Sequence, residues 1–183
     1  IDLDNTIEKN IKNLSDYKNK KINEITVCLL DRDRHFEIIK SIKKIGAKVK
    51  LITDGDVAGA LLVSDKKYNV DIFVGIGGGP EGVIAATALD AMNCNFQGRF
   101  IFATDKDKVR AKQMGIKDLN KKYQINEIVK GDSIFCATGI TPGDLINGLK
   151  KDGSNFHTET LITHKSENLV SIIQKKYITE WNL

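Results

Sequence analysis

The 183-residue chain has a formal net charge of +4, with 41% hydrophobic and 28% charged residues. It is long enough to bury a core as one soluble domain. Its charge comes from scattered lysines rather than a dense basic stripe with interleaved aromatic residues, which argues against a nucleic-acid partner. No apolar run has the length of a membrane span and no signal peptide opens the sequence, so we expect a cytoplasmic protein with no membrane partner. The three cysteines lack C-x-x-C spacing, which suits reduced thiols.

Strand, polar turn and helix follow one another repeatedly along the chain, after a surface helix at residues 6–20 with a Thr6 cap. The first four predicted strands are residues 25–31, 47–53, 71–76 and 99–105. Such repeated units imply an α/β fold, with a parallel or mixed sheet that helices cover on both faces. No linker or internal repeat interrupts this pattern, so we expect a single α/β domain over residues 1–183.

Two further segments carry detailed predictions. Residues 32–46 read as a helix that ends at Gly46, and one side of this helix is apolar: Phe36, Ile39, Ile42 and Ile45. A fifth apolar run at 133–137 ends in the polar turn 138–144. After it, residues 157–164 and 168–177 predict an antiparallel hairpin across the turn 165–167.

The stretch from Asp71 to Ala91 reads as a buried strand, a glycine turn and the opening of a helix. Gly77 to Gly79 allow a tight turn and Pro80 suits the first helical position. Residues 77–82 also satisfy G-x-G-x-x-G, and Asp105 follows about two dozen residues on, as in a dinucleotide-binding unit.

Glu81 sits inside this turn, where its charge would repel a pyrophosphate unless a cation lay between them. A divalent ion between carboxylate and phosphate is the arrangement of metal-assisted phosphoryl hydrolysis. A third interpretation is a plain strand-to-helix turn, in which Glu81 only interacts favourably with the helix dipole.

Ligands of open α/β sheets bind outside the carboxyl ends of the strands. That rule predicts that four polar turns gather at one edge: Asp31 to His35, Asp54 to Asp56, Gly77 to Glu81 and Thr138 to Thr141. Here Arg32 and Arg34 flank Asp33, and arginine forks suit bidentate phosphate contact; solvated surface arginines are the alternative.

The acidic residues of this edge have several possible roles. Asp54 and Asp56 could accept hydrogen bonds from sugar hydroxyls, bind a metal or cap the next helix. Glu81 is the best candidate for a metal ligand, although a hard cation needs more than one carboxylate. His35 is interpreted as a helix-start or substrate-edge residue, and no Ser/His/Asp or Cys/His arrangement predicts a covalent nucleophile.

Five segments together carry a resemblance to a known family: RDRH at 32–35, ITDGDVAGAL at 52–61, GIGGGPEGVIAATALDAM at 75–92, QGRF at 97–100 and ATGITPGDLINGL at 137–149. In this order they resemble the class II fructose-1,6-bisphosphatases, some of which also act on sedoheptulose 1,7-bisphosphate. The resemblance runs through nearly the whole chain.

This resemblance implies a lithium-sensitive sugar-phosphatase-type fold and hydrolysis of the 1-phosphate of fructose 1,6-bisphosphate to fructose 6-phosphate. It implies Mn²⁺ or Mg²⁺ as cofactor, a homo-oligomer, and a place in gluconeogenesis and glycerol metabolism. By motif, Glu81 falls on a catalytic metal ligand. The positions that fall on substrate-binding segments are Arg32, Asp33, Arg34, Asp54, Gly55, Asp56 and Gly78.

The chain departs from the family pattern in two ways. Asp33 stands where the family often has Pro and Gly79 where Ala is usual; the added charge of Asp33 would weaken phosphate binding. Family members are also nearly twice as long, and their N-terminal half carries the other acidic ligands. The chain thus resembles a C-terminal half that would fold but turn over little alone. Two alternatives stay open: a dinucleotide-binding module, and a catalytically silent domain kept for assembly.

Overall fold

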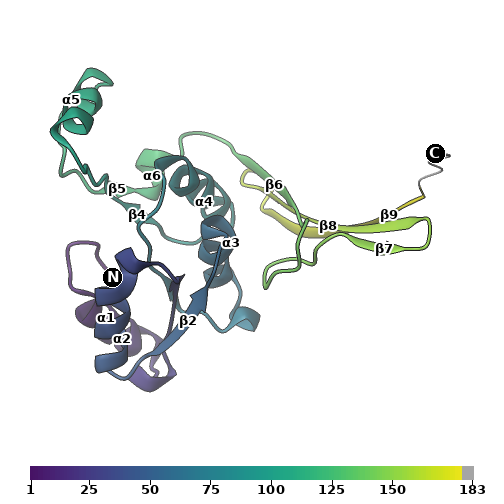
Figure 1. The fold of residues 1–183 in the computed structure, drawn as a ribbon, viewed down its shortest axis with the longest axis horizontal. Helices are drawn as coiled ribbons and strands as arrows, with labels where there is room; N and C mark the ends of the chain where they lie inside the picture. The colour runs from purple at the N-terminus through teal and green to yellow at the C-terminus, as the bar shows by residue number, and fades with distance from the viewer. Residues whose placement is uncertain (179–183) are drawn as a thin grey trace.

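The computed structural model describes residues 1–178, which form an α/β body and an antiparallel sheet that projects from it (Figure 1). The body contains a three-stranded parallel sheet in the order β2-β1-β3. Its strands are β1 (Thr26–Leu30), β2 (Lys48–Ile52) and β3 (Ile72–Phe73). The first three predicted strands are therefore confirmed, with β1 in the centre.

Helices cover both faces of this sheet, because successive side chains of the central strand point to opposite sides. Val27 and Leu29 pack in one core cluster with side chains of α1 (Ile7–Lys18) and α2 (Phe36–Lys44). Cys28 packs in a second cluster with α3 (Asp56–Leu61) and α4 (Gly79–Ala91). The α/β class and the helices on both faces are confirmed.

Local signals set the ends of the first two helices. The Thr6 hydroxyl accepts a hydrogen bond from Lys9 N at 3.3 Å and caps α1, as predicted. Gly46 follows α2 with φ +86°, a conformation that glycine adopts without strain. Of the residues predicted to share the apolar side of this helix, Ile42 is fully buried, whereas Phe36 is 63% exposed. A 3₁₀ turn at Asp33–His35 precedes α2 and buries His35 in its place.

The prediction of a fourth parallel strand at residues 99–105 is wrong. This segment passes beside a two-stranded antiparallel sheet of β4 (Gln97–Gly98) and β5 (Tyr123–Gln124). Its apolar pattern serves aromatic packing instead, since the Phe100 ring lies 6.0 Å from that of Phe102 and 5.8 Å from that of Tyr123. The helix predicted after it is present as α5 (Asp105–Gln113), which lies beyond β4 and β5 in Figure 1.

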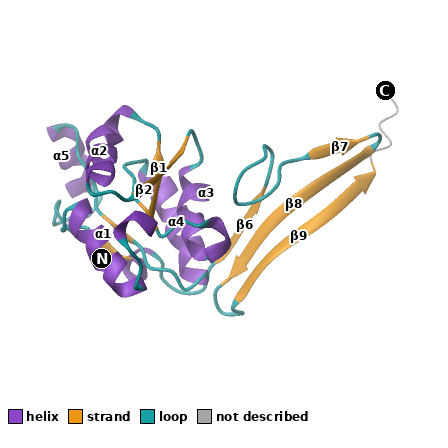
Figure 2. Ribbon diagram, turned by 90° about the horizontal axis from the view of Figure 1, so that it is seen from below, coloured by secondary structure: helices purple, strands orange, loops and turns teal. Residues whose placement is uncertain are grey.

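The strands after residue 133 build the projecting sheet, in which β8 pairs antiparallel with three others. They are β6 (Ile134–Thr138), β7 (Lys150–Asp152), β8 (Asn155–His164) and β9 (Leu169–Ile178). The predicted hairpin is confirmed as β8 and β9, which extend away from the helices in Figure 2. The strands of the chain are thus divided between separate parallel and antiparallel sheets.

The loop between β6 and β7 attaches this sheet to the body. Leu145 enters the core cluster beside α3 and α4. The carbonyl of Leu145 accepts a hydrogen bond from Tyr68 Oη at 3.3 Å, and Asp144 pairs with Lys50 of β2 at 2.6 Å. The projecting sheet is therefore held to the body by side-chain packing, a hydrogen bond and an ion pair, in addition to the chain connection.

Short elements complete the fold: α6 (Ile125–Ile128) and 3₁₀ turns at Ile22–Glu24, Leu62–Ser64 and Lys66–Tyr68. Within residues 1–178, none of the helices has both the length and the apolar character needed to cross a membrane.

Candidate functional site

Three of the four predicted polar turns meet at the carboxyl edge of the parallel sheet. Strands β2, β1 and β3 are neighbours and parallel, so the turns that follow them leave the sheet on the same side. The fourth, Thr138 to Thr141, does not belong there, because β6 pairs antiparallel with β8 in the projecting sheet. That part of the prediction is wrong, since an apolar strand pattern does not reveal which sheet the strand joins.

The RDRH segment holds the glycine turn from one side. Arg34 Nε donates to the carbonyl of Ile76 at 2.5 Å. The His35 ring bonds to the carbonyl of Leu30 at 2.8 Å and to the amide N of Ile76 at 2.9 Å. Arg32 and Asp33 are exposed at the same edge. The structure thus gives Arg34 a structural contact that the sequence did not predict, and leaves its terminal nitrogens outside that contact.

Two carboxylates approach the glycine turn closely. A Cβ at Gly77 would lie 2.5 Å from Asp56 Oδ2, and one at Gly78 would overlap the Glu81 carboxylate. Side chains at these positions would displace both acids, so the absence of a Cβ is what permits this approach. The structure therefore brings Asp56, from the start of α3, and Glu81, from the first turn of α4, onto consecutive residues of one turn.

The Asp54-Gly55-Asp56 turn has a local explanation as well. Asp54 Oδ1 accepts a hydrogen bond from the amide of Gly55 at 2.9 Å. Gly55 precedes α3 with φ +86°, a conformation that L residues rarely adopt. Asp54 is exposed and Asp56 half-buried. The Asp54 carboxylate is thus exposed to solvent, and the Asp56 carboxylate lies against Gly77.

The carboxylates of Asp56 and Glu81 are the type of ligand that a hard divalent cation prefers, but two of them are too few to form a complete site. Mg²⁺ and Mn²⁺ prefer carboxylate oxygen and need several ligands, and Asp56 and Glu81 supply such oxygens. Among residues 1–178, however, no three His, Cys, Asp or Glu side chains gather as a metal site would require. The described residues form at most part of a metal site.

The structure does not support the dinucleotide-binding interpretation, because the strand expected before Asp105 is not present in the parallel sheet. Asp105 is the first residue of α5 and pairs with Lys108 at 2.8 Å. The segment before it is not a strand of the parallel sheet, whereas a dinucleotide unit places that acid at the end of the neighbouring parallel strand. Asp105 and the glycine turn thus do not form such a unit.

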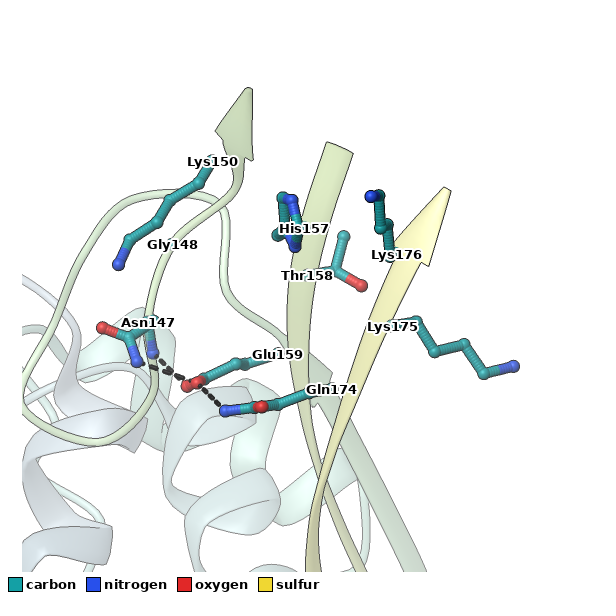
Figure 3. Close-up of a pocket in the computed structure, with 9 residues that line it drawn as sticks. All are labelled: Asn147, Gly148, Lys150, His157, Thr158, Glu159, Gln174, Lys175 and Lys176. Carbon is teal, nitrogen blue, oxygen red and sulfur yellow. Dashed lines mark hydrogen bonds between the residues drawn. The ribbon is translucent and has the colours of Figure 1, made fainter. Parts of the chain in front are cut away.

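The projecting sheet carries a hollow of about 470 Å³ that the sequence analysis did not find (Figure 3). The Glu159 carboxylate lies beside it and accepts hydrogen bonds from Asn147 N and Nδ2 and from Gln174 Nε2, at 2.7 to 2.8 Å. These bonds hold the pKa of Glu159 below its usual value. The residues that line the hollow are Asn147, Gly148, Lys150, His157, Thr158, Glu159, Gln174, Lys175 and Lys176.

The glycines of ATGITPGDLINGL explain the loop beside this hollow. A Cβ at Gly148 would lie 2.5 Å from Pro142 N, and one at Gly139 would overlap the carbonyl of Asn147. The loop therefore folds back on its own backbone at two points where only glycine fits. These glycines are the sequence signal for a tight structural loop.

Asp132, His164 and Ser166 also lie together, but not as a catalytic triad. Asp132 Oδ2 and Ser166 Oγ both contact the same ring nitrogen of His164, at 2.7 and 3.1 Å. A triad uses the two ring nitrogens for the two partners. The hydrogen bonds from His164 and Ser166 lower the pKa of Asp132, and the group stabilises the β8-β9 turn.

The parallel sheet, with arginines and carboxylates on the turns of its carboxyl edge, defines an α/β protein suited to small anionic ligands. Comparison with known proteins is more specific. The sequence model of a protein family, the bacterial fructose-1,6-bisphosphatases encoded by glpX, matches residues 1–177. The chain belongs to this family.

Curated relatives are named D-fructose 1,6-bisphosphatase class 2/sedoheptulose 1,7-bisphosphatase. The protein of Synechococcus sp. (strain JA-2-3B'a(2-13)) is 36% identical over an alignment that covers 94% of this chain and 54% of the relative. That of Synechocystis sp. (strain ATCC 27184 / PCC 6803 / Kazusa) is 33% identical over an alignment that covers 98% of this chain and 56% of the relative. The chain spans about half the length of the curated relatives it matches.

Proposed function

We propose that the chain forms part of a phosphatase that hydrolyses the 1-phosphate of fructose 1,6-bisphosphate to fructose 6-phosphate and phosphate. The observation that carries this proposal is the meeting of three polar turns at one sheet edge, in a chain that belongs to the bisphosphatase family. Sedoheptulose 1,7-bisphosphate is a second candidate substrate, favoured by the double name of the relatives.

The proposed roles follow from the chemistry of each turn. Arg32 and Arg34 offer guanidinium forks that match the geometry of a phosphate. The carboxylates of Asp54 and Asp56 accept hydrogen bonds, as sugar hydroxyls require. Asp33, Gly55 and Gly78 complete the proposed substrate-binding turns. The free N–H groups at the start of α4 add a favourable field for an anion.

Glu81 is the proposed catalytic metal ligand for Mn²⁺ or Mg²⁺, with the Asp56 carboxylate as its neighbour. A divalent cation bound there would supply electrophilic stabilisation of the phosphate charge. Because residues 1–178 contain no complete metal cluster, the proposal requires acidic ligands from outside them. The relatives have the extra length for such residues. We therefore propose that the chain acts as the C-terminal part of a longer phosphatase, within a single α/β domain of the lithium-sensitive phosphatase type.

The remaining parts of the proposal concern the setting of the enzyme. We propose a homo-oligomer in the cytoplasm that acts in carbohydrate metabolism, in gluconeogenesis and glycerol use. The partner is a small sugar bisphosphate rather than a nucleic acid or a membrane.

The test measures phosphate release from both sugar bisphosphates with Mn²⁺. It compares the chain alone with the chain joined to the coding sequence upstream of it in its gene. Each form is also prepared as Glu81→Gln. Asp105→Asn is the matched control, because Asp105 is likewise an acid in the first turn of a helix but belongs to none of the three turns at the edge.

We expect release by the joined form only, abolished by Glu81→Gln and retained by Asp105→Asn. Strong turnover by the chain alone would contradict the requirement for outside ligands. Release by neither form would favour a silent domain kept for assembly. Protection against unfolding by NAD rather than by sugar bisphosphate would contradict the proposed substrate class.

A further inference from the structure

His35 is a buried histidine whose two ring nitrogens are bonded to two different segments. Its side chain is fully buried. Nδ1 lies 2.8 Å from the carbonyl oxygen of Leu30, the last residue of β1, and Nε2 lies 2.9 Å from the amide N of Ile76. A backbone carbonyl only accepts and an amide N–H only donates. The ring is therefore the tautomer that carries its proton on Nδ1, which donates to Leu30, while Nε2 accepts from the Ile76 N–H.

Ile76 is held at both of its backbone polar groups by adjacent side chains of one motif. The N–H of Ile76 donates to His35 and its carbonyl accepts from Arg34 Nε at 2.5 Å. The bond from Val74 N to Cys28 O is the last backbone pairing of this segment with β1. Beyond it, the turn relies on side chains for its position.

The position of Ile76 sets that of the glycines that follow it directly. Gly77 lies against the Asp56 carboxylate and Gly78 against that of Glu81. Because glycines restrict the backbone little, a turn of this composition needs an external anchor to keep one conformation. The anchor at Ile76 is one residue away from the first of these contacts.

We propose that His35, as the neutral Nδ1–H tautomer, is a positioning residue for the phosphatase site. It fixes the turn at Ile76 to the end of β1 and so holds the carboxylates of Asp56 and Glu81 in register with each other. This inference rests on the proposed function for its catalytic consequence. The alternative is a core histidine that contributes to stability alone.

Two amide variants separate the two hydrogen bonds of the ring. In His35→Gln the amide oxygen reaches the place of Nε2 and can accept from Ile76 N–H, while the bond to Leu30 is lost. In His35→Asn the amide nitrogen takes the place of Nδ1 and can donate to Leu30, while the bond to Ile76 is lost. Each variant thus loses one hydrogen bond, but only His35→Asn releases the turn.

The experiment uses the chain joined to its upstream coding sequence and has two readouts. Hydrogen–deuterium exchange at Ile76 should be about tenfold faster in His35→Asn, as expected for one lost hydrogen bond, and near the wild-type rate in His35→Gln. In phosphate release with Mn²⁺, His35→Asn should lower kcat about 10- to 100-fold, the usual effect of losing a group that orients metal ligands. It should also raise the Mn²⁺ concentration for half-maximal activity, whereas His35→Gln should restore both values.

Equal protection of Ile76 in the two variants would overturn the proposal. So would equal losses of kcat after correction for the folded fraction, since a purely structural role does not distinguish the two bonds. If the wild-type protein releases no phosphate, the proposed function fails. The exchange rate at Ile76 then decides by itself whether His35 positions the turn.

Discussion

Asp71 provides a direct test of how the body of the fold is held together. Its side chain is only 5% exposed, and one oxygen accepts hydrogen bonds from Lys18 Nζ at 2.7 Å and Lys20 Nζ at 2.8 Å. The other oxygen accepts from Thr26 N at 2.9 Å. The carboxylate thereby joins the end of α1, the start of β1 and the start of β3. Asp71→Asn removes its charge with little change of shape.

The expected loss follows from these contacts. Hydrogen bonds to charged groups contribute about 1.5–3 kcal/mol each, and ion pairs with partly exposed lysines about 0.2–1 kcal/mol. Asparagine keeps one oxygen for Thr26 N–H, so we expect Asp71→Asn to lower the free energy of unfolding by about 1–3 kcal/mol at pH 7. Asp105→Asn, which removes one exposed pair with Lys108, should change it by less than about 0.5 kcal/mol.

The effect should also depend on pH in a defined direction. Burial alone would raise the pKa of Asp71, but the hydrogen bonds from Lys18, Lys20 and Thr26 outweigh it, so its pKa is lowered. A lowered pKa in the folded state contributes stability above the unfolded value of about 3.9, and this contribution is lost as pH falls through the folded value. The difference between wild type and Asp71→Asn should therefore be constant from pH 7 to 5 and shrink below pH 4.

Urea unfolding followed by circular dichroism, at constant ionic strength between pH 7 and pH 3, measures this difference. Other carboxylates titrate in the same range, but they are common to both proteins and cancel. A loss no larger than that of Asp105→Asn at pH 7, or a difference that persists unchanged at low pH, would refute the reasoning.

Three further outcomes are expected. Gly77→Ala should displace the Asp56 carboxylate and lower phosphate release by the joined protein at least tenfold. The free energy of unfolding should change by less than about 1 kcal/mol. Gly82→Ala is the control: a Cβ there meets open space, so phosphate release should be unchanged. Gly148→Ala forces a Cβ against backbone and should cost more than about 2 kcal/mol in urea unfolding, and a smaller loss would contradict the tight loop. Cys136 is exposed, whereas burial raises the pKa of Cys28 to about 11. A thiol reagent at pH 8 should therefore label Cys136 at once and Cys28 only in urea. Early labelling of Cys28 in the folded protein would argue against its burial.

The sequence by itself determined the elements that depend on neighbouring residues. Thr6 caps α1 and Gly46 ends α2, because both signals act within one turn of helix. The helix after the glycine turn begins at Gly79, one residue before the start that Pro80 predicts, and the β8-β9 hairpin lies where alternating apolar residues and a short polar turn place it. The repeated strand-turn-helix order also predicted a shared edge for four polar turns, and three of them lie there.

Only the tertiary structure decided which partner each pattern meets. The apolar side chains of residues 99–105 pack against aromatic rings instead of lying in a strand of the parallel sheet. Strand β6 pairs in the projecting sheet instead of the parallel one. The local hydrophobic pattern is the same in either case, so it cannot predict the partner. The bonds of Arg34 and His35 to Ile76 span 42 and 41 residues of sequence. Such contacts arise from the side-by-side packing of β1 and β3, and no local periodicity records them, so the sequence identified the residues of the edge and the fold decided how they hold one another.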